Sequence, residues 1–434
     1  SGDEPTESGD QPTGDPFLGC DGVVLEQDGV LDLDIPEAAY VVVSGQVRVN
    51  GEPLPDAPGP RGQLRFEVAA KGEPTSAVQV LETIDDEDYT VVIPAGVVRV
   101  HYIPDAAQCA EDPGGPLPCS GGVVLKNIDI GESGVLDVDI PSIVVSGKVT
   151  QGGEELPDAD GDRGHLEFLR ESEVTATGSL DTSGAATYSL ALFPDTYSVA
   201  FAGNPGLCAE GAAPVACNRG VVVSDVALTA SGVLDVEVPR VEVSGAVTVN
   251  GAAVPDGMSD RGALRFDPVD PAMGVGLLAG SFAAEGPVTY AVSLIAGTYT
   301  VALAANPGQC TGAVPPTPCV GGPLLAAVDL TMSGVLDVDI PMIVVGGDIT
   351  REGAALPQED GDRGSVGFAR DGGDATAVAL GTDGPIDYVL GVVPGTYALS
   401  YVANAGLCDG VTAPAMPCSS GPLQTLAQIG RAHV

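Results

Sequence analysis

Pairs of acidic residues at alternating positions recur four times along the chain, each inside a nearly identical segment. "SGVLDVDIP" occupies residues 133–141 and again 333–341, with "DGVLDLDIP" at 28–36 and "SGVLDVEVP" at 231–239. Residues i and i+2 of a strand share a face and lie about 6–7 Å apart, so each pair could bracket a cation or act in acid–base catalysis. The pairs are Asp32 and Asp34, Asp137 and Asp139, Asp235 and Glu237, and Asp337 and Asp339.

The residues between these acids favour a structural interpretation. Leu, Val and Ile occupy the intervening positions in strict alternation. A half-buried strand needs this pattern, because it turns apolar side chains to the core and polar side chains to water. We therefore expect four strands whose acids face solvent, with metal ligation as the second interpretation.

The stretch "DADGD" carries the strongest calcium signal in the sequence. Asp158, Asp160 and Asp162 alternate around a glycine, as in part of a calcium-binding loop. The loop lacks a glutamate at its twelfth position, and the corresponding segments read "DAPGP", "DGMSD" and "QEDGD". We expect either a weak calcium contact or an ordinary turn here, and no other cofactor.

An Arg-Gly pair returns at the same place in each repeat, ahead of a short alternating strand. A guanidinium fork at the start of a strand can form an ion pair or clamp backbone carbonyl groups. We predict a structural role, with each arginine paired to an acid of its own repeat. The arginines are Arg61, Arg163, Arg261 and Arg363.

Catalytic groups do not recur with the repeats. His101, His165 and His433 stand at unrelated repeat positions, so no histidine returns to serve as a base. The sequence contains no G-x-S-x-G, P-loop, dinucleotide-binding or H-E-x-x-H motif. We predict that the chain is not an enzyme and has no catalytic residues.

Eight of the nine cysteines fall into pairs nine or ten residues apart, around loops rich in Pro, Gly and Ala. No histidine accompanies a pair, so the spacing does not fit a zinc site. We predict four local disulfides, with Cys20 unpaired: Cys109 with Cys119, Cys208 with Cys217, Cys310 with Cys319, and Cys408 with Cys418. The alternative leaves Cys418 free and joins Cys20 to Cys109, Cys119 to Cys208, Cys217 to Cys310, and Cys319 to Cys408.

The elements that position these residues repeat about every 100 residues, as the spacing of Pro36, Pro141, Pro239 and Pro341 indicates. This period is too long for a solenoid unit and suits tandem small domains. We place domains at 40–141, 142–239, 240–341 and 342–428, the last lacking its final strand. Residues 17–39 form strands of a partial or differently phased unit, and residues 1–16 form an acidic, disordered linker.

Each repeat shows about seven short β-branched or alternating runs, such as "IVVSGKVTQGG" and "GHLEFLR", and no segment with a helical period. The expected fold is all-β, a tandem array of about four antiparallel seven-stranded β-sandwich domains. One glycine recurs inside the first strand of every repeat, which predicts a bulge or a close backbone contact. These glycines are Gly45, Gly147, Gly245 and Gly347.

"VVSGKVTQGGEELP" and "GTDGPIDYVLGVVPGTYALSY" carry a family resemblance. Over nearly all of residues 40–428 the chain resembles the carboxypeptidase regulatory-like domain, a transthyretin-like β-sandwich common in bacterial surface proteins. The resemblance implies an accessory or spacer module without catalysis.

Both ends raise separate expectations. Residues 1–16 resemble the spacer after the lipidated cysteine of a bacterial lipoprotein, which suggests a lipid anchor upstream of Ser1. The last residues, "IGRAHV" at 429–434, match the translated start of a common sequencing-library adapter. We expect them to be an assembly artefact and the gene to continue. No apolar run reaches the ~18 residues of a transmembrane helix.

Charge and cysteines define the expected environment. With 60 acidic and 17 basic residues the chain carries a formal charge of −43, which repels nucleic acid and anionic lipid. Disulfides imply an extracellular or cell-surface location, either secreted or as an outer-membrane lipoprotein, with the periplasm as an alternative. We expect a stalk, spacer or interaction scaffold that meets a protein or glycan partner. The alternative is a calcium-stiffened adhesin or a glycan-binding array.

Overall fold

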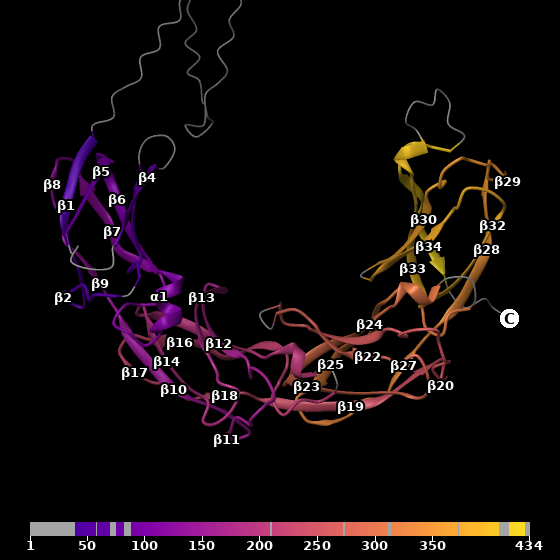
Figure 1. The fold of residues 1–434 in the computed structure, drawn as a ribbon, viewed down its shortest axis with the longest axis horizontal. Coiled ribbons are helices and arrows are strands. Elements are labelled where there is room, and N and C mark those ends of the chain that lie inside the picture. The colour runs from indigo at the N-terminus through magenta and orange to yellow at the C-terminus, as the bar shows by residue number, and fades with distance from the viewer. Residues whose placement is uncertain are drawn as a thin grey trace, which may run out of the picture. The chain divides into compact units, whose positions relative to one another are not determined.

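The structure, a computed structural model, describes residues 40–57, 59–69, 75–81, 88–208, 211–271, 274–310, 314–371, 373–407 and 416–429. Nearly all regular structure in these residues is β-strand (Figure 1). Two compact units divide the chain, Ser1–Ser142 with Ala191–Phe193 and Ile143–Leu190 with Pro194–Val434. The described strands form eight sheets of three to five strands, and each repeat contributes two of them, as tandem β-sandwiches do.

The first sandwich lies within residues 40–140. One sheet contains β1 (Tyr40–Val49), β2 (Glu52–Pro53), β5 (Asp88–Pro94), β8 (Gly134–Val135) and β9 (Val138–Ile140). The facing sheet has the order β4 (Thr75–Val80), β3 (Gln63–Ala69), β6 (Gly96–Ile103) and β7 (Gly122–Ile130).

The second and third sandwiches repeat this arrangement. In the second sandwich, the first sheet contains β10 (Ile143–Gln151), β11 (Glu154–Glu155), β14 (Thr187–Leu192), β17 (Gly232–Val233) and β18 (Val236–Glu237). Its facing sheet has the order β13 (Glu173–Ser179), β12 (His165–Arg170), β15 (Asp195–Ala202) and β16 (Arg219–Leu228). In the third sandwich, the first sheet contains β19 (Arg240–Val249), β20 (Ala252–Ala253), β23 (Val288–Ile295), β26 (Gly334–Val335) and β27 (Val338–Ile340). Its facing sheet has the order β22 (Leu277–Ser281), β21 (Ala263–Pro268), β24 (Gly297–Ala304) and β25 (Gly322–Leu330).

The fourth sandwich has a smaller first sheet. It contains only β28 (Ile343–Arg351), β29 (Ala354–Ala355) and β32 (Ile386–Val392) among the described residues. The facing sheet keeps four strands, β31 (Ala375–Ala379), β30 (Ser365–Arg370), β33 (Gly395–Val402) and β34 (Gly421–Ile429).

The last strand of each complete sandwich departs from the antiparallel pairing that we expected. Residues Val138–Ile140 of β9 pair with β1 in parallel, and β18 and β27 pair in the same way with β10 and β19. The chain reaches this strand directly from β7 of the facing sheet, so it crosses between sheets and does not return through a hairpin.

The core between the sheets follows the alternation in the sequence. Val41, Val43 and Val47 of β1 are at most 4% exposed, whereas Val42 between them is 45% exposed. An aromatic pair joins the two sheets in every sandwich, with ring centroids 5.4 to 5.9 Å apart. These pairs are Phe66 with Tyr89, Phe168 with Tyr188, Phe266 with Tyr290, and Phe368 with Tyr388.

Among the described residues the expectation of no helix is wrong for one α-helix, and short 3-10 helices also occur at Pro205–Cys208, Pro307–Cys310 and Ala405–Leu407. Residues Ala106–Glu111 form the short helix α1, and the Asp105 side chain caps it by accepting hydrogen bonds from Ala107 N and Gln108 N. Six residues are too few to show a helical period, so the sequence pattern could not reveal this turn.

Some of the predictions concern residues outside the described ranges. They are the linker 1–16, the partial unit 17–39 with Cys20, Asp32 and Asp34, and also Cys408 and His433. Among the described residues, no helix is long and apolar enough to cross a membrane.

Candidate functional site

We call residues 133–141, 231–239 and 333–341 the closing segments, because they complete the first, second and third sandwiches. In the first, pairing to β1 stops after Val135 and resumes at Val138. Around this gap, side-chain oxygens of the closing segment accept hydrogen bonds from backbone amides of the first strand. The bonds run from Val42 N to Ser133 Oγ (2.9 Å), from Gln46 N to Asp137 Oδ1 (2.9 Å) and from Gly51 N to Asp139 Oδ1 (2.8 Å).

The other two closing segments repeat these bonds. In the second sandwich they join Val144 N to Ser231 Oγ (3.0 Å), Lys148 N to Asp235 Oδ1 (2.9 Å) and Gly153 N to Glu237 Oε1 (3.2 Å). In the third they join Glu242 N to Ser333 Oγ (2.9 Å), Ala246 N to Asp337 Oδ1 (2.8 Å) and Gly251 N to Asp339 Oδ1 (2.7 Å). The acids are exposed, as the alternation predicts, but they also fasten the last strand to the first.

The recurring glycine makes room for the closing segment. A Cβ atom at Gly45, Gly147 or Gly245 would lie only 2.0 to 2.1 Å from the carbonyl oxygen of Leu136, Leu234 or Leu336. No side chain fits at that distance, so glycine is required at these three positions. The close backbone contact, rather than a bulge, explains why glycine recurs at this position of the first strand.

In each of these sandwiches a buried tyrosine also binds the leucine carbonyl of the closing segment. The hydroxyls of Tyr89, Tyr188 and Tyr290 donate hydrogen bonds of 2.5 to 2.6 Å to the Leu136, Leu234 and Leu336 carbonyls. Burial raises the pKa of each tyrosine above its usual value, and the nearby Asp137, Asp235 or Asp337 raises it further. The hydroxyl proton therefore remains in place as a donor.

The four repeated arginines are completely buried at the starts of the second sheets. Arg163 donates to the carbonyls of Leu156 (2.9 Å), Gly184 (2.9 Å) and Ser183 (3.3 Å) and to that of Asp181. Four of the five guanidinium N–H donors thus bind carbonyl groups of two loops, and one of these carbonyls, that of Leu156, is buried.

Of the ion pairs that we predicted for the four arginines, the structure shows those of Arg163 and Arg261. The carboxylates of Asp158 and Asp256 lie 4.0 Å from the guanidinium groups of Arg163 and Arg261. In the fourth sandwich Gln358 stands at the corresponding position, and Arg363 donates to the carbonyls of Leu380 (2.8 Å) and Pro357 (3.1 Å). Arg61 likewise donates to the carbonyls of Leu54 and Pro55. Backbone carbonyls are therefore partners of all four arginines, and an acid is an added partner of Arg163 and of Arg261.

The calcium candidate is built as a turn. Asp158 Oδ1 accepts a hydrogen bond from Gly184 N (2.7 Å), and Asp162 Oδ1 accepts one from Gly164 N (2.9 Å), while Asp160 is exposed. Within the described residues, no three His, Cys, Asp or Glu side chains converge in a way that could hold a metal ion.

Disulfides join Cys109 to Cys119, Cys208 to Cys217, and Cys310 to Cys319. Cys418 is also disulfide-bonded, and its predicted partner Cys408 lies outside the described residues. The bonded pairs are incompatible with the alternative connectivity, in which Cys119 would join Cys208 and Cys217 would join Cys310.

The disulfide loop of the second sandwich contacts the third. Cys217 N donates to the Ser293 carbonyl (3.0 Å), and Ile295 N donates to Asn218 Oδ1 (2.7 Å). Ser293 and Ile295 belong to β23, which is the outer strand of its sheet and would otherwise present open backbone groups. We call this contact between a disulfide loop and the outer strand of the following repeat the joint.

Side chains reinforce the joint between the second and third sandwiches. Asn218 Nδ2 donates to the Tyr299 hydroxyl (2.8 Å), which in turn donates to the Ile295 carbonyl (2.6 Å). Burial raises the pKa of Tyr299 to about 12, although the hydrogen bond with Asn218 lowers it. Ser293 Oγ donates to the Ala213 carbonyl within the disulfide loop (2.6 Å). Cys208, Cys217 and Ser293 have no exposed surface.

The joint recurs with equivalent atoms. Cys319 N donates to the Gly391 carbonyl (2.7 Å) of β32, and Cys319 and Val320 belong to the core of the fourth sandwich. In the first compact unit Cys119 N donates to the Ala191 carbonyl (2.8 Å), and Phe193 packs in the core of that unit. Sequence reasoning missed the joint, although a small residue recurs at its centre as Ala191, Ser293 and Gly391.

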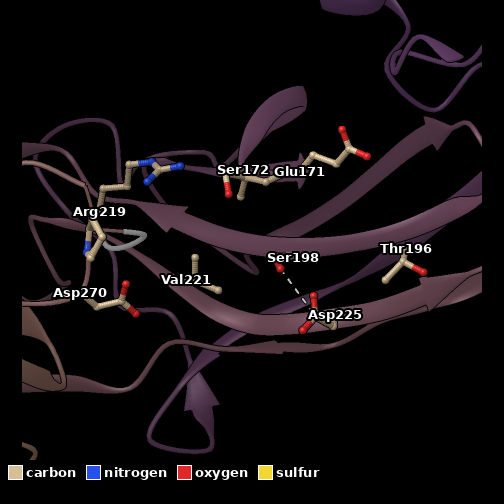
Figure 2. A pocket seen from close by; sticks show the side chains of 10 residues that line it. Glu171, Ser172, Thr196, Ser198, Arg219, Val221, Asp225 and Asp270 are labelled. Carbon is tan, nitrogen blue, oxygen red and sulfur yellow. Dashed lines mark hydrogen bonds between the residues drawn. The ribbon is translucent and has the colours of Figure 1, made fainter.

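The described surface also contains a polar pocket of about 450 Å³ (Figure 2). Figure 2 shows Ser198 and Asp225 together on β15 and β16, where Asp225 N donates to Ser198 Oγ (3.3 Å), with Arg219 and Asp270 at the other end. The Arg219 guanidinium binds Glu167 Oε2 (2.6 Å). The described residues that line this pocket include no histidine and no cysteine.

The two described histidines lie beside glutamates on strands. His101 Nε2 is 3.0 Å from Glu67 Oε2, and His165 Nε2 is 3.4 Å from Glu167 Oε1. Neither histidine lines the pocket of Figure 2. Among the described residues, the groups that recur in several repeats are those that fasten the closing segments and those that form the joints.

No protein-family model matches the chain, and no curated protein matches it. Solved structures with detectable similarity include a streptococcal ancillary pilin, at 12% identity over 65% of this chain and 96% of that chain with a TM-score of 0.20. They also include the pilus adhesin SpaC of Lactobacillus rhamnosus GG in its open conformation, at 15% identity over 79% of this chain and 43% of that chain with a TM-score of 0.20. The Bacillus anthracis TIE protein is similar at 10% identity over 92% of this chain and 74% of that chain with a TM-score of 0.18. Because these sequence identities and TM-scores are low, the function proposed below rests on contacts within this chain alone.

Proposed function

We propose that the chain is a non-enzymatic stalk of an extracellular or cell-surface protein. It holds consecutive β-sandwiches in fixed succession and so presents whatever is attached to it at a distance from its anchor. The joint is the observation that carries this proposal. A domain array joined only by linkers would be free to bend, whereas the second and third disulfide loops here bind the outer strand of the next repeat.

The disulfides support both the location and the mechanism. Structural disulfides persist in oxidising compartments such as the cell surface and the medium. Each one closes a small loop, which removes freedom from the segment that must meet the next sandwich. The strongly acidic surface favours solubility and opposes nonspecific association with nucleic acid and anionic membranes.

Calorimetric unfolding of two matched variants tests the joint. Asn218→Ala removes two hydrogen bonds to the third sandwich, whereas Asn204→Ala removes two hydrogen bonds within the second, to the Asp162 carbonyl and from the Gly206 amide. We expect the second and third sandwiches of the native chain to unfold together. Asn218→Ala should separate the unfolding transitions of the two sandwiches. Asn204→Ala should leave them as one shared transition at a lower temperature. Independent unfolding of the two sandwiches in the native chain would contradict the proposal.

A further inference from the structure

The disulfide between Cys208 and Cys217 is completely buried at the joint between the second and third sandwiches. Neither cysteine has exposed surface, and Val215 in the loop between them is equally buried. Thiol–disulfide exchange requires a thiolate to attack one of the two sulfur atoms, so its rate depends on access to them. While the joint is closed, a reductant in solution cannot reach this disulfide.

The third sandwich covers this disulfide. Cys208 Sγ lies 3.9 Å from the carbonyl oxygen of Ser293, on β23. Arg240 of β19 donates to Ser293 Oγ (2.8 Å) and to the Ala213 carbonyl of the disulfide loop (2.7 Å). Ser293 Oγ donates to the same Ala213 carbonyl (2.6 Å). Movement of the third sandwich away from the loop would therefore uncover Cys208.

The disulfide of the third sandwich provides a contrast within the same compact unit. Cys319 is 2% exposed, but its partner Cys310 is only partly buried. Cys310 Sγ lies 3.8 Å from the carbonyl oxygen of Asn306, which belongs to its own sandwich. A reductant can therefore reach Cys310 more readily than Cys208 without separation of two sandwiches.

We propose that the Cys208–Cys217 disulfide is a redox site gated by its joint. It resists external dithiols while the joint is closed and reacts with them once the joint has opened. This inference rests on the proposed function, because it requires the joint to hold the second and third sandwiches together. Local opening of a contact between folded sandwiches needs less free energy than unfolding of either one.

The reaction is exchange with a dithiol outside the chain. One thiolate of the dithiol attacks a cysteine sulfur, the S–S bond breaks, and the other cysteine leaves as a thiolate that takes up a proton. The second thiolate of the dithiol then displaces the first cysteine, which is protonated in turn, and the dithiol is released as a cyclic disulfide. Two electrons thus pass from the dithiol to the cysteine pair.

Reduction in turn affects the joint. If the closed joint favours the oxidised cysteines, then the oxidised cysteines favour the closed joint by the same factor. Reduction releases the disulfide loop that must meet β23, so a joint opened in a reducing medium closes less readily afterwards. The loss of stiffness therefore outlasts the event that opened the joint.

Rates of reduction test the gating. The oxidised full chain is incubated with dithiothreitol, samples are alkylated at intervals, and mass spectrometry of the peptides follows each disulfide. We expect Cys208–Cys217 to be reduced more slowly than Cys310–Cys319, by about tenfold or more. In urea-unfolded chain the two rates should become similar. Equal rates in the folded chain would overturn the proposal.

Matched variants separate opening of the joint from general loss of stability. Ser293→Ala removes a hydrogen bond to Ala213 across the joint, whereas Thr248→Ala removes one to Asp339 within the third sandwich. We expect Ser293→Ala to accelerate reduction of the buried disulfide about fivefold, the equivalent of one hydrogen bond, and Thr248→Ala to leave it unchanged. Asn218→Ala, which removes two hydrogen bonds, should accelerate it further.

The outcomes distinguish this inference from the proposed function. Equal acceleration by Ser293→Ala and Thr248→Ala would contradict gating by the joint. Fast reduction of Cys208–Cys217 in a native chain whose second and third sandwiches still unfold together would also contradict the gating, and would leave the stalk function standing. Independent unfolding of these sandwiches in the native chain would overturn both.

Discussion

A buried arginine that binds carbonyl oxygens is the residue-scale feature shared by all four sandwiches. Its guanidinium donates hydrogen bonds to backbone carbonyls of the loops, in place of the water that the fold excludes. Loss of the guanidinium leaves at least one buried carbonyl and several partly buried ones without this donor, and a fully buried group without a partner costs about 1–3 kcal/mol. The surrounding loop should therefore lose its order before the sheets do.

Substitution of Arg163 measures this role. We expect Arg163→Met to lower the free energy of unfolding by about 2–4 kcal/mol, since relaxation and water recover part of the lost hydrogen bonding. Arg170→Ala, which removes an exposed ion pair with Asp195, should lower it by less than about 1 kcal/mol. Urea denaturation provides both values, and equal losses would refute a special role for the buried arginine.

The buried tyrosines give the fold a predictable response to alkali. Burial raises the pKa of Tyr188 in the folded state, whereas an unfolded tyrosine loses its proton near pH 10. Above that pH the unfolded state binds fewer protons than the folded state, so the free energy of unfolding falls as the pH rises. Below it, Tyr188 contributes no pH dependence.

We expect Tyr188→Phe to lose about 1 kcal/mol at pH 8, because the Leu234 carbonyl loses its donor. Between pH 10 and 11.5 the variant should lose less stability than the native chain. Denaturation curves across this range test the prediction. Parallel pH profiles for the two proteins would show that the Tyr188 hydroxyl does not titrate with unfolding.

At the scale of the element, the closing segment joins its sandwich through groups that a strand pattern does not reveal. Gly245 accommodates the Leu336 carbonyl, while Gly347 in the same repeat position faces open space apart from the Tyr388 ring. This difference supplies a matched pair of substitutions.

We expect Gly245→Ala to destabilise the third sandwich by about 1–3 kcal/mol, because a Cβ forces the closing segment away from β19. Gly347→Ala should change stability by no more than about 0.5 kcal/mol. Hydrogen exchange at the β19 amides should rise only in the first variant. Equal effects of the two substitutions would contradict the assigned contact.

The sequence was sufficient to predict the strands, the alternation and the exposure of Asp137 and Asp139, since these depend on local spacing. It was not sufficient to predict parallel pairing, because partners such as Gln46 and Asp137 are distant in sequence and strand direction leaves no local signal. The arginine positions were predictable from their recurrence. Their carbonyl partners were not, because every residue type carries the same carbonyl group.

At the scale of the whole molecule, stiffness depends on whether the joints hold. The local disulfides were predictable from cysteine spacing, but the contact of Cys217 with Ser293 was not, because it joins successive repeats. Edge-strand backbone groups are satisfied there by a loop that a disulfide constrains. Under the proposed function, reduction of these cysteines should make the stalk less rigid.

The width of the distance distribution between the second and third sandwiches is the most direct test of this account. Fluorophores placed at the exposed positions Val174 and Leu278 through encoded non-natural residues allow single-molecule energy transfer without using cysteine. We predict one narrow distribution in the oxidised native chain. The double substitution Cys208→Ser, Cys217→Ser should broaden it, and the matched Cys109→Ser, Cys119→Ser should not. A broad distribution in the oxidised chain, or no change on removal of the Cys208–Cys217 disulfide, would contradict a stalk stiffened by its joints.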